Sequence, residues 1–408
     1  MRHIFAGIFM LSGMLLLAQD SEQTETKKAG IRFTGFVKSD YWYDSRQVVA
    51  AREDLFLLFP SSKRLDLNGE DINARPTFNY SAITSRLTGI ISGPDAFGAE
   101  TSGVIEADFS GVTNADINSF RLRHAYAKLR WEKSELLFGQ YWHPMFVPEV
   151  FPNVISLNTG APFQPFIRNP QIAYKHYSGD FNISLTLISQ RDNSSDGPAG
   201  FSPQYMRNSL MPNAHLQLQH KTENHVWGLA ADYKVLQPRL ETPGRLKTNE
   251  SIGSYAFMVY HKFRSDQFLW SAKTIYGQNL TEHLMMGGYA VRSFDELTMF
   301  ETYTPTNHLN FWSFISYGNH VRLGLFGGFL KNFGTTHKNT GIYYARGHDI
   351  DYLYRLAPSV SFISNNVQIS TELEYTAAAF GSPDQKGKVQ NSEEIGNLRL
   401  LLTFFYFF

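Results

Sequence analysis

The residues best suited to chemistry are basic side chains on neighbouring predicted strands. Arg121 and Arg123 are two positions apart, so a β-strand projects both from one face. Arg86 and Lys38 lie on earlier predicted strands, and Arg168 ends a long loop. If these strands belong to a membrane-spanning barrel, each charged side chain that faces the lipid would cost about 2–4 kcal/mol near the membrane midplane. Facing a lumen, guanidinium groups bind carboxylates or phosphates through paired donors, which predicts an anion-guiding strip.

Other charged residues share the face that alternation assigns to the lumen. Glu149, in the loop opposite the strip, could set up a transverse field across a constriction. Ordinary solvation of a polar lumen, or snorkelling toward the membrane surfaces, is the alternative for these side chains. The charged residues expected to face the lumen are Glu106, Asp108, Asp232, Lys234, Lys273, Arg322, Arg355, Glu372, Glu374 and Arg399. The acids among them weaken the expected anion selectivity.

The segment 143–169 must position part of this strip. It is apolar for a loop and contains Pro144, Pro148, Pro152, Pro162 and Pro165. A stiff apolar segment is poorly suited to solvent, so we expect it to fold inward against the barrel wall and narrow the pore. An external cap or a subunit contact is the alternative.

A second apolar loop, 47–75, contains the run Leu-Phe-Leu-Leu-Phe-Pro at 55–60. An exposed apolar patch of this size suggests a partner. We expect Leu57 and Phe59 to act as a latch onto a neighbouring barrel in a symmetric trimer. Packing over the rim of its own barrel is the alternative.

The elements that carry these residues are strands. Alternating polarity predicts about sixteen, at 31–46, 76–92, 99–112, 118–131, 133–142, 170–178, 180–190, 213–221, 224–236, 251–263, 267–278, 307–317, 321–332, 351–363, 367–379 and 397–408. Short turns alternate with long connections, as in outer-membrane barrels. The predicted fold is therefore all-β: a transmembrane antiparallel β-barrel with short periplasmic turns and long extracellular loops. Charged pairs on one strand face favour a wide, water-filled barrel over a small barrel filled by side chains. The regular alternation of short and long connections argues against a soluble sandwich.

The two ends of the chain agree with export to an outer membrane. Residues 1–18 have the basic start and apolar core of a signal peptide, and 19–30 are a polar, flexible periplasmic leader. The barrel then spans 31–408. From Leu398 every second residue is apolar and the chain ends on Phe408, as in closing strands that barrel-assembly machinery reads. A buried terminal strand of a soluble β-sandwich is the alternative.

Composition excludes several classes. The formal net charge is zero, which argues against a nucleic-acid partner, and aromatic residues form 15% of the chain, which suits two interfacial girdles. No hydrolase, metalloprotease or nucleotide-binding motif is present, so we expect no enzyme and no cofactor. The thirteen histidines are scattered without metal-ligand spacing; His124 is expected on the lipid side or at an interface, and His143 in a loop. Sequence spacing leaves open the alternative of a catalytic Ser–His pair, as in a barrel lipase, because the two residues of such a pair meet only in the folded protein.

Three segments, 120–129, 137–142 and 168–172, resemble DcaP-type porins. They read Phe-Arg-Leu-Arg-His-Ala-Tyr-Ala-Lys-Leu, Leu-Phe-Gly-Gln-Tyr-Trp and Arg-Asn-Pro-Gln-Ile. More broadly the chain is similar to trimeric sixteen-strand porins. The resemblance implies homotrimers, uptake of small, often anionic, organic solutes, and Arg121, Arg123 and Arg168 at the constriction. Some members carry periplasmic coiled-coil heptads, for which 19–30 is too short.

The sequence therefore predicts a porin in the outer membrane of a Gram-negative bacterium, surrounded by the lipid bilayer. Small hydrophilic solutes would diffuse passively through a pore constricted by the segment 143–169. The alternative is a non-conducting barrel that binds ligands or partners through its extracellular loops.

Overall fold

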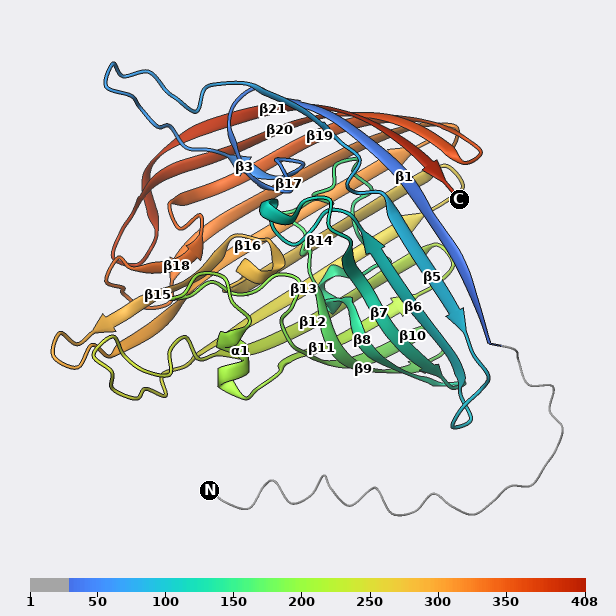
Figure 1. Cartoon of the computed structure of the whole chain (residues 1–408), viewed down its shortest axis with the longest axis horizontal. Coiled ribbons are helices and arrows are strands. Elements are labelled where there is room, and N and C mark those ends of the chain that lie inside the picture. The colour runs from blue at the N-terminus through green and yellow to red at the C-terminus, as the bar shows by residue number, and fades with distance from the viewer. Residues whose placement is uncertain (1–28) are drawn as a thin grey trace, which may run out of the picture.

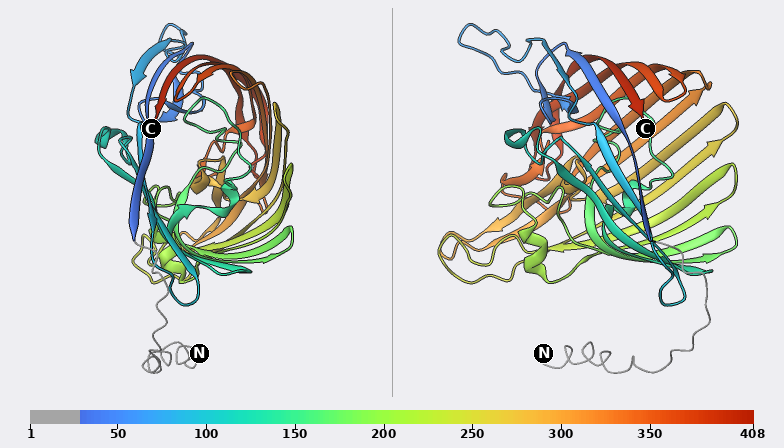
Figure 2. Two further views of the ribbon diagram at one scale, coloured as in Figure 1. Left: turned by 90° about the vertical axis from the view of Figure 1, so that its right-hand side faces the viewer. Right: turned by 45° about the vertical axis from the view of Figure 1, so that its right-hand side comes forward.

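The computed structural model describes residues 29–408, so the predicted signal peptide and nearly all of the predicted leader lie outside the described residues. One antiparallel sheet curls until its first strand pairs with its last, which closes a barrel of sixteen wall strands (Figures 1 and 2). The wall consists of β1 (Gly30–Asp44), β4 (Thr77–Ser81) with β5 (Arg86–Ser92), β6 (Glu100–Asp108), β7 (Arg121–Arg130), β8 (Ser134–Trp142), β9 (Arg168–Ser178), β10 (Phe181–Ile188), β11 (Asn213–Lys221), β12 (His225–Leu236), β13 (Ile252–Arg264), β14 (Phe268–Gln278), β16 (Glu301–Tyr317), β17 (Val321–Thr335), β19 (Ile350–Ser364), β20 (Val367–Pro383) and β21 (Val389–Phe407).

The predicted fold class is confirmed, and every predicted strand overlaps a wall strand. β4 and β5 both pair with β1 and together form one interrupted wall strand. Within residues 29–408, no helix is long and apolar enough to cross a membrane.

The connections contain more regular structure than alternation revealed. Two hairpin partners, β2 (Val48–Ala51) and β3 (Phe56–Pro60), occupy the first long loop. β15 (Gly287–Phe294) pairs with both β16 and β18 (Tyr343–Arg346), which extends the sheet beyond the wall. The connections also contain four short helices: η1 (Asn114–Asp116), η2 (Pro144–Phe146), α1 (Gln204–Ser209) and η3 (Thr281–His283). These extensions lack a lipid-facing apolar period, which is why the sequence pattern missed them.

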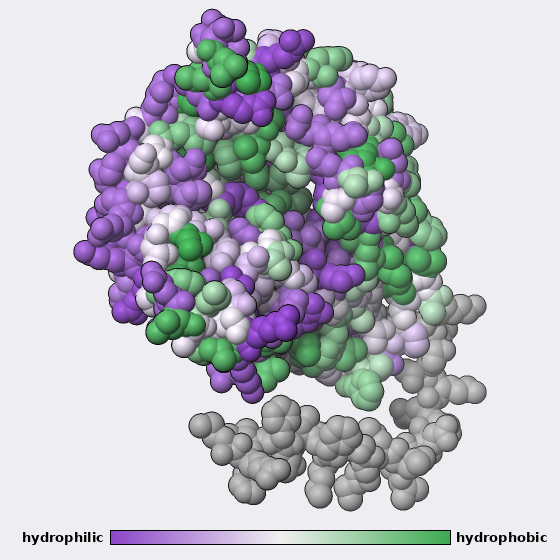
Figure 3. Space-filling model, turned by 60° about the vertical axis from the view of Figure 1, so that its left-hand side comes forward, coloured by the Kyte–Doolittle hydropathy of each residue, from purple (hydrophilic) through white to green (hydrophobic). Residues whose placement is uncertain are grey.

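The two faces of the wall have opposite chemistry. In β10, Phe181, Ile183 and Leu185 are exposed on the outside, whereas Asn182 and Ser184 are buried on the inside. Figure 3 shows hydrophobic residues over much of the visible wall and hydrophilic residues gathered around the loop-bearing end. This inversion of a soluble protein's pattern suits a wall surrounded by lipid.

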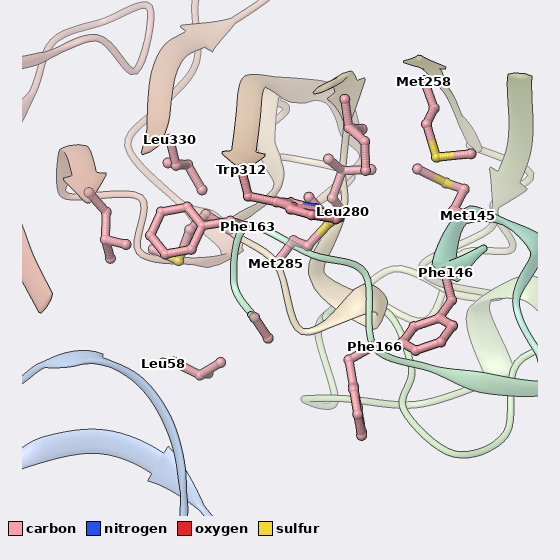
Figure 4. Packing of buried hydrophobic residues seen from close by; sticks show 14 of the residues in the cluster. Leu58, Met145, Phe146, Phe163, Phe166, Met258, Leu280, Met285, Trp312 and Leu330 are labelled. Atoms are coloured by element: carbon pink, nitrogen blue, oxygen red, sulfur yellow. The ribbon is translucent and has the colours of Figure 1, made fainter. Parts of the chain in front are cut away.

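Part of the barrel interior is dry. Apolar residues from β3, from the segment 143–169 and from the η3 region pack against inward-facing wall residues such as Trp312 and Leu330 (Figure 4). The rings of Trp142 and Phe146 stack with centroids 3.8 Å apart. The lumen therefore contains a folded apolar insert beside its polar wall.

The predicted trimer latch is wrong. Leu57 and Phe59 are 0% and 5% exposed, because the β2–β3 hairpin turns into the barrel. Phe59 joins the apolar cluster that includes Phe146 and Phe163, and its ring lies 6.5 Å from that of Phe380. Burying this apolar run inside its own barrel removes it from water without a partner.

A buried ion pair fastens the seam between the first and last strands. Arg399 on β21 donates from Nε to Asp44 Oδ1 at 2.9 Å and from Nη2 to Asp44 Oδ2 at 2.7 Å. The same guanidinium reaches the Leu55 carbonyl oxygen at 3.2 Å, so it also ties the inward hairpin to the wall.

We predict that Arg399→Met destabilises the folded barrel by about 3–5 kcal/mol, because Asp44 is left buried and unpaired. The temperature at which the folded electrophoretic band disappears should fall. The double variant Asp44→Asn/Arg399→Met removes the stranded charge and should recover much of the loss. Equal melting of the single and double variants would contradict a role for the ion pair.

Candidate functional site

The segment 143–169 lies inside the barrel, where charged wall residues bind its backbone. Lys273 Nζ donates to the carbonyl oxygens of Met145 and Phe146 at 3.1 and 2.7 Å. Arg355 Nη1 donates to the Ala161 carbonyl oxygen at 2.7 Å. Glu372 accepts hydrogen bonds from the backbone N–H groups of Ile155 and Ser156, at 2.8 and 3.2 Å. A buried irregular segment needs partners for its backbone, and the wall supplies them.

Most charged residues predicted to face the lumen do point inward, but they are not solvated there. The buried ones are Asp108, Asp232, Lys234, Lys273, Arg355, Glu372, Glu374 and Arg399. Glu106 and Arg322 are partly covered. The expectation of simple lumen solvation is wrong for the buried group, because inserted loops cover these side chains and use them as hydrogen-bond partners.

The predicted arginine strip is one connected cluster on β5, β7 and β9. Arg123 donates from Nε to Glu106 at 2.7 Å and from Nη1 to Asp108 at 2.8 Å. Arg121 Nη2 lies 3.0 Å from the Oδ2 atom of the same Asp108, and Arg86 Nε lies 3.7 Å from Glu106. Strand pairing explains this contact, since Asp108 and Arg121 are cross-strand partners.

A β-bulge shapes the middle of the cluster. The β6–β7 register shifts between Glu106 and Ala107, so Arg123 is an extra residue in its strand. The bulge breaks alternation, and His124 turns inward beside Arg123. His124 is 5% exposed and its ring lies 5.2 Å from that of Tyr141. Its predicted position on the lipid side or at an interface is therefore wrong.

Two residues of the cluster come from loops and were missed by sequence reasoning. Asp192 accepts hydrogen bonds from Arg168 Nε at 3.0 Å and Nη2 at 2.6 Å, and from Arg121 Nη1 at 3.4 Å. Arg52, at the tip of the β2–β3 hairpin, lines the same small cavity as Arg121, Arg168 and Asp192. Loops have no alternation of polar and apolar residues that would assign their side chains to a face. The one signal for Asp192 was its position just after a predicted strand.

Electrostatics keeps Asp192 ionised. Burial alone would raise the pKa of this carboxyl, but the guanidinium groups of Arg168 and Arg121 outweigh burial and hold its pKa below the ordinary value. Five arginines thus meet three carboxylates, and the cluster retains positive charge. Arg168 is fully buried, and its Nη1 has no hydrogen-bond partner among residues 29–408.

The remaining predicted residues lie elsewhere. Lys38 is buried with Asp40 at 3.1 Å and donates to the Ile155 carbonyl oxygen at 3.4 Å. Glu149 lines a separate cavity of about 230 Å³ with Lys128 and Lys175. Within residues 29–408, no ion pair joins Glu149 to an arginine, and its transverse field across the constriction stays a prediction.

The closed sheet, its apolar outer face and its polar inner face define the chain as a sixteen-strand β-barrel with a lipid-facing wall. No protein-family model matches the chain, and no curated protein matches its sequence. Solved structures do match. The channel DcaP of Acinetobacter baumannii superposes with a TM-score of 0.69 at 16% identity, covering 93% of this chain and 98% of DcaP.

Two further structures share the fold at lower similarity. The outer-membrane protein OmpT of Vibrio cholerae has a TM-score of 0.55 at 10% identity, covering 95% of this chain and all of OmpT. OmpF of Salmonella typhi, solved with daunomycin, has a TM-score of 0.50 at 9% identity, covering 93% of this chain and 97% of OmpF. The resemblance to DcaP-type porins is confirmed at the level of the fold.

Two adjacent glycines on β17 offer a test of the packing of segment 143–169. A Cβ atom at Gly328 would lie 2.6 Å from the Phe163 ring, whereas one at Gly327 would meet nothing within 4 Å. We predict that Gly328→Ala pushes Phe163 away from the wall and lowers single-channel conductance, with overpacking costing about 1–3 kcal/mol.

Gly327→Ala is the matched control, since it adds the same methyl group to the same strand on the other face. Its conductance and melting temperature should stay close to those of the unmodified protein. Indistinguishable behaviour of the two variants would contradict the contact between Phe163 and the wall.

Proposed function

We propose that this chain is an outer-membrane porin of a Gram-negative bacterium through which small hydrophilic solutes diffuse passively. Small organic anions are the favoured solutes. The segment 143–169 narrows a water-filled pore, and transport needs no cofactor and no energy source. The fold of the barrel and its similarity to DcaP, which is described as an outer-membrane channel, support the channel function.

The observation that carries the anion preference is the arginine cluster beside its small cavity. The cavity, about 80 Å³, is lined by three guanidinium groups, those of Arg52, Arg121 and Arg168, and by the rings of Phe56 and Phe166. Guanidinium groups bind carboxylates in a two-pronged manner, and the apolar rings suit the carbon skeleton of an organic acid. Arg123 is paired with both Glu106 and Asp108, so we assign it the role of holding those acids.

Asp192 sets the strength of this attraction. Its carboxylate already occupies donors of Arg168 and Arg121, in the way a carboxylate solute would. A solute therefore meets a cluster that is attractive but partly satisfied. Weak binding suits a channel, because a solute must leave as readily as it enters.

We propose a homotrimer as the working assembly. One structure of the Vibrio cholerae protein OmpT is described as a trimer, with a TM-score of 0.54 at 9% identity. We also propose that Phe408 is presented to barrel-assembly machinery. Its backbone pairs with Gly35 at 3.0 and 3.1 Å, while its side chain is 54% exposed at the end of the closing strand.

A non-conducting barrel that binds ligands through its loops is the second candidate. The apolar insert formed by β3 and the segment 143–169 favours it, because this insert fills part of the interior. Planar-bilayer recording separates the two candidates, since a folded barrel without conductance supports only the second.

We predict that Arg121→Gln lowers the chloride-to-potassium permeability ratio about twofold, because one lumen cation is lost. Folding should be preserved, since Arg123 still pairs with Asp108. The reversal potential under a salt gradient measures the ratio. Arg64→Gln, on an exposed loop, is the control and should leave the ratio unchanged; an equal effect of both variants would sink the assignment.

We predict the opposite change for Asp192→Asn, which frees two guanidinium groups and should raise the same ratio about twofold. Asp196→Asn removes the same charge from the same loop without contacting the arginine cluster, and is the matched control. If Asp192→Asn leaves anion permeability unchanged or lowers it, Asp192 does not compete with permeating anions.

A further inference from the structure

Three histidines and one aspartate gather in the barrel interior, apart from the arginine cluster. His143 begins the segment 143–169, His215 lies on β11, Asp232 lies on β12, and His283 ends η3. All four are buried. Sequence spacing predicted no metal site, because these residues lie far apart in the chain and meet only through the barrel pairing of β11 with β12 and the inward loops.

The distances suit a shared cation. His215 Nδ1 lies 3.0 Å from Asp232 Oδ2, and His143 Nε2 lies 3.7 Å from the same oxygen. One ligand atom from each of these three residues lies within 4.8 Å of the others. Ligand atoms around tetrahedral zinc are roughly 3.3–3.5 Å apart, so small side-chain shifts suffice for coordination.

His283 lies beside the group, although the three residues whose ligand atoms lie within 4.8 Å of one another do not include it. Its ring stands nearly perpendicular to that of His143, with centroids 4.6 Å apart. One further ring nitrogen, His283 Nδ1, is buried without a hydrogen-bond partner among residues 29–408. Buried polar atoms without partners are costly, and a metal ion is one species that satisfies imidazole nitrogens.

The charge balance also favours a cation. Among residues 29–408, the basic side chains with a nitrogen within 4.0 Å of the Asp232 carboxylate are imidazoles only, those of His143 and His215. Lys234 is the next residue on the same face of β12, but it forms its ion pair with Glu282 and not with Asp232. Asn213 donates to Asp232 Oδ1 at 2.8 Å, which fixes the carboxylate in the way that outer hydrogen bonds orient metal ligands.

We propose that His143, His215 and Asp232 form a binding site for a divalent first-row metal ion of the zinc type, and that the neighbouring His283 moves in as the fourth ligand when the metal binds. Imidazole nitrogens with one carboxylate match the ligand preference of Zn²⁺. The site would join the start of segment 143–169, the wall strands β11 and β12, and the η3 loop, and so hold two inward loops to the wall.

Metal binding is coupled to the first turn of the segment. His143 Nδ1 accepts a hydrogen bond from the Met145 N–H at 3.2 Å, so its proton is on Nε2, facing Asn213 Oδ1 at 2.8 Å. For Nε2 to bind a metal, the ring proton must move to Nδ1, and the Met145 hydrogen bond is lost. Zinc should therefore shift the turn that Lys273 holds, and channel conductance should change with it.

The test is zinc titration of the chelator-stripped full-length protein, refolded in detergent, by calorimetry and by the visible absorption of bound Co²⁺. We expect one tight site per chain. His215→Gln and Asp232→Asn, checked for a folded electrophoretic band, should each weaken binding at least tenfold. His320→Ala, a lone exposed histidine in a turn, should leave affinity unchanged.

An exposed pair, His225 and His261, is the competing explanation, since their ring nitrogens lie 3.2 Å apart. The double variant His225→Ala/His261→Ala should keep the tight site. Loss of tight binding in that variant, or unchanged binding in folded His215→Gln and Asp232→Asn, would overturn the proposal. The proposal does not rest on porin activity, because metal affinity is measured without any conductance.

Discussion

The structure depends on one constraint: the backbone of the inserted loops must find hydrogen-bond partners inside the barrel. The segment 143–169 and the β2–β3 hairpin are apolar and leave water, but their peptide groups are polar. Arg355 meets this demand for both insertions, bonding the Ala161 carbonyl oxygen at 2.7 Å and that of Leu58 at 2.9 Å. Glu372 serves N–H groups in the same way, so charged wall residues act as anchors for the insert.

The same constraint divides the interior into regions of different character. Where loops cover the wall, the charged side chains bind backbone groups or form ion pairs, as Lys273 and Arg399 do. In the cluster that joins β5, β7, β9 and the β2–β3 hairpin, five arginines outnumber three acids, and positive charge remains beside a cavity. We propose that selectivity arises from this incompletely neutralised network, in which the loop residue Asp192 matters as much as the wall arginines do.

The sequence predicted the wall well because lipid imposes a period of two on every strand. Residues such as Phe181 and Asn182 sort by that rule alone. Strand parity also placed Arg121 and Arg123 on one face, and the resemblance to porins correctly grouped Arg168 with them. The loops follow no such rule, so the inward turn of Leu57 and the arrival of Asp192 could not be predicted. The predicted position of His124 was wrong for a local reason, because a β-bulge changes which face the following residues occupy and the sequence does not show the bulge.

The central claim is that positive charge on the inner wall governs what passes through this barrel. Single-channel recording of the unmodified, refolded protein in a planar bilayer under a salt gradient tests it most directly. We expect open channels, closing in three steps for a trimer, with a reversal potential of the sign that marks anion preference. A folded barrel that stays silent, or a reversal potential of the opposite sign, would contradict it.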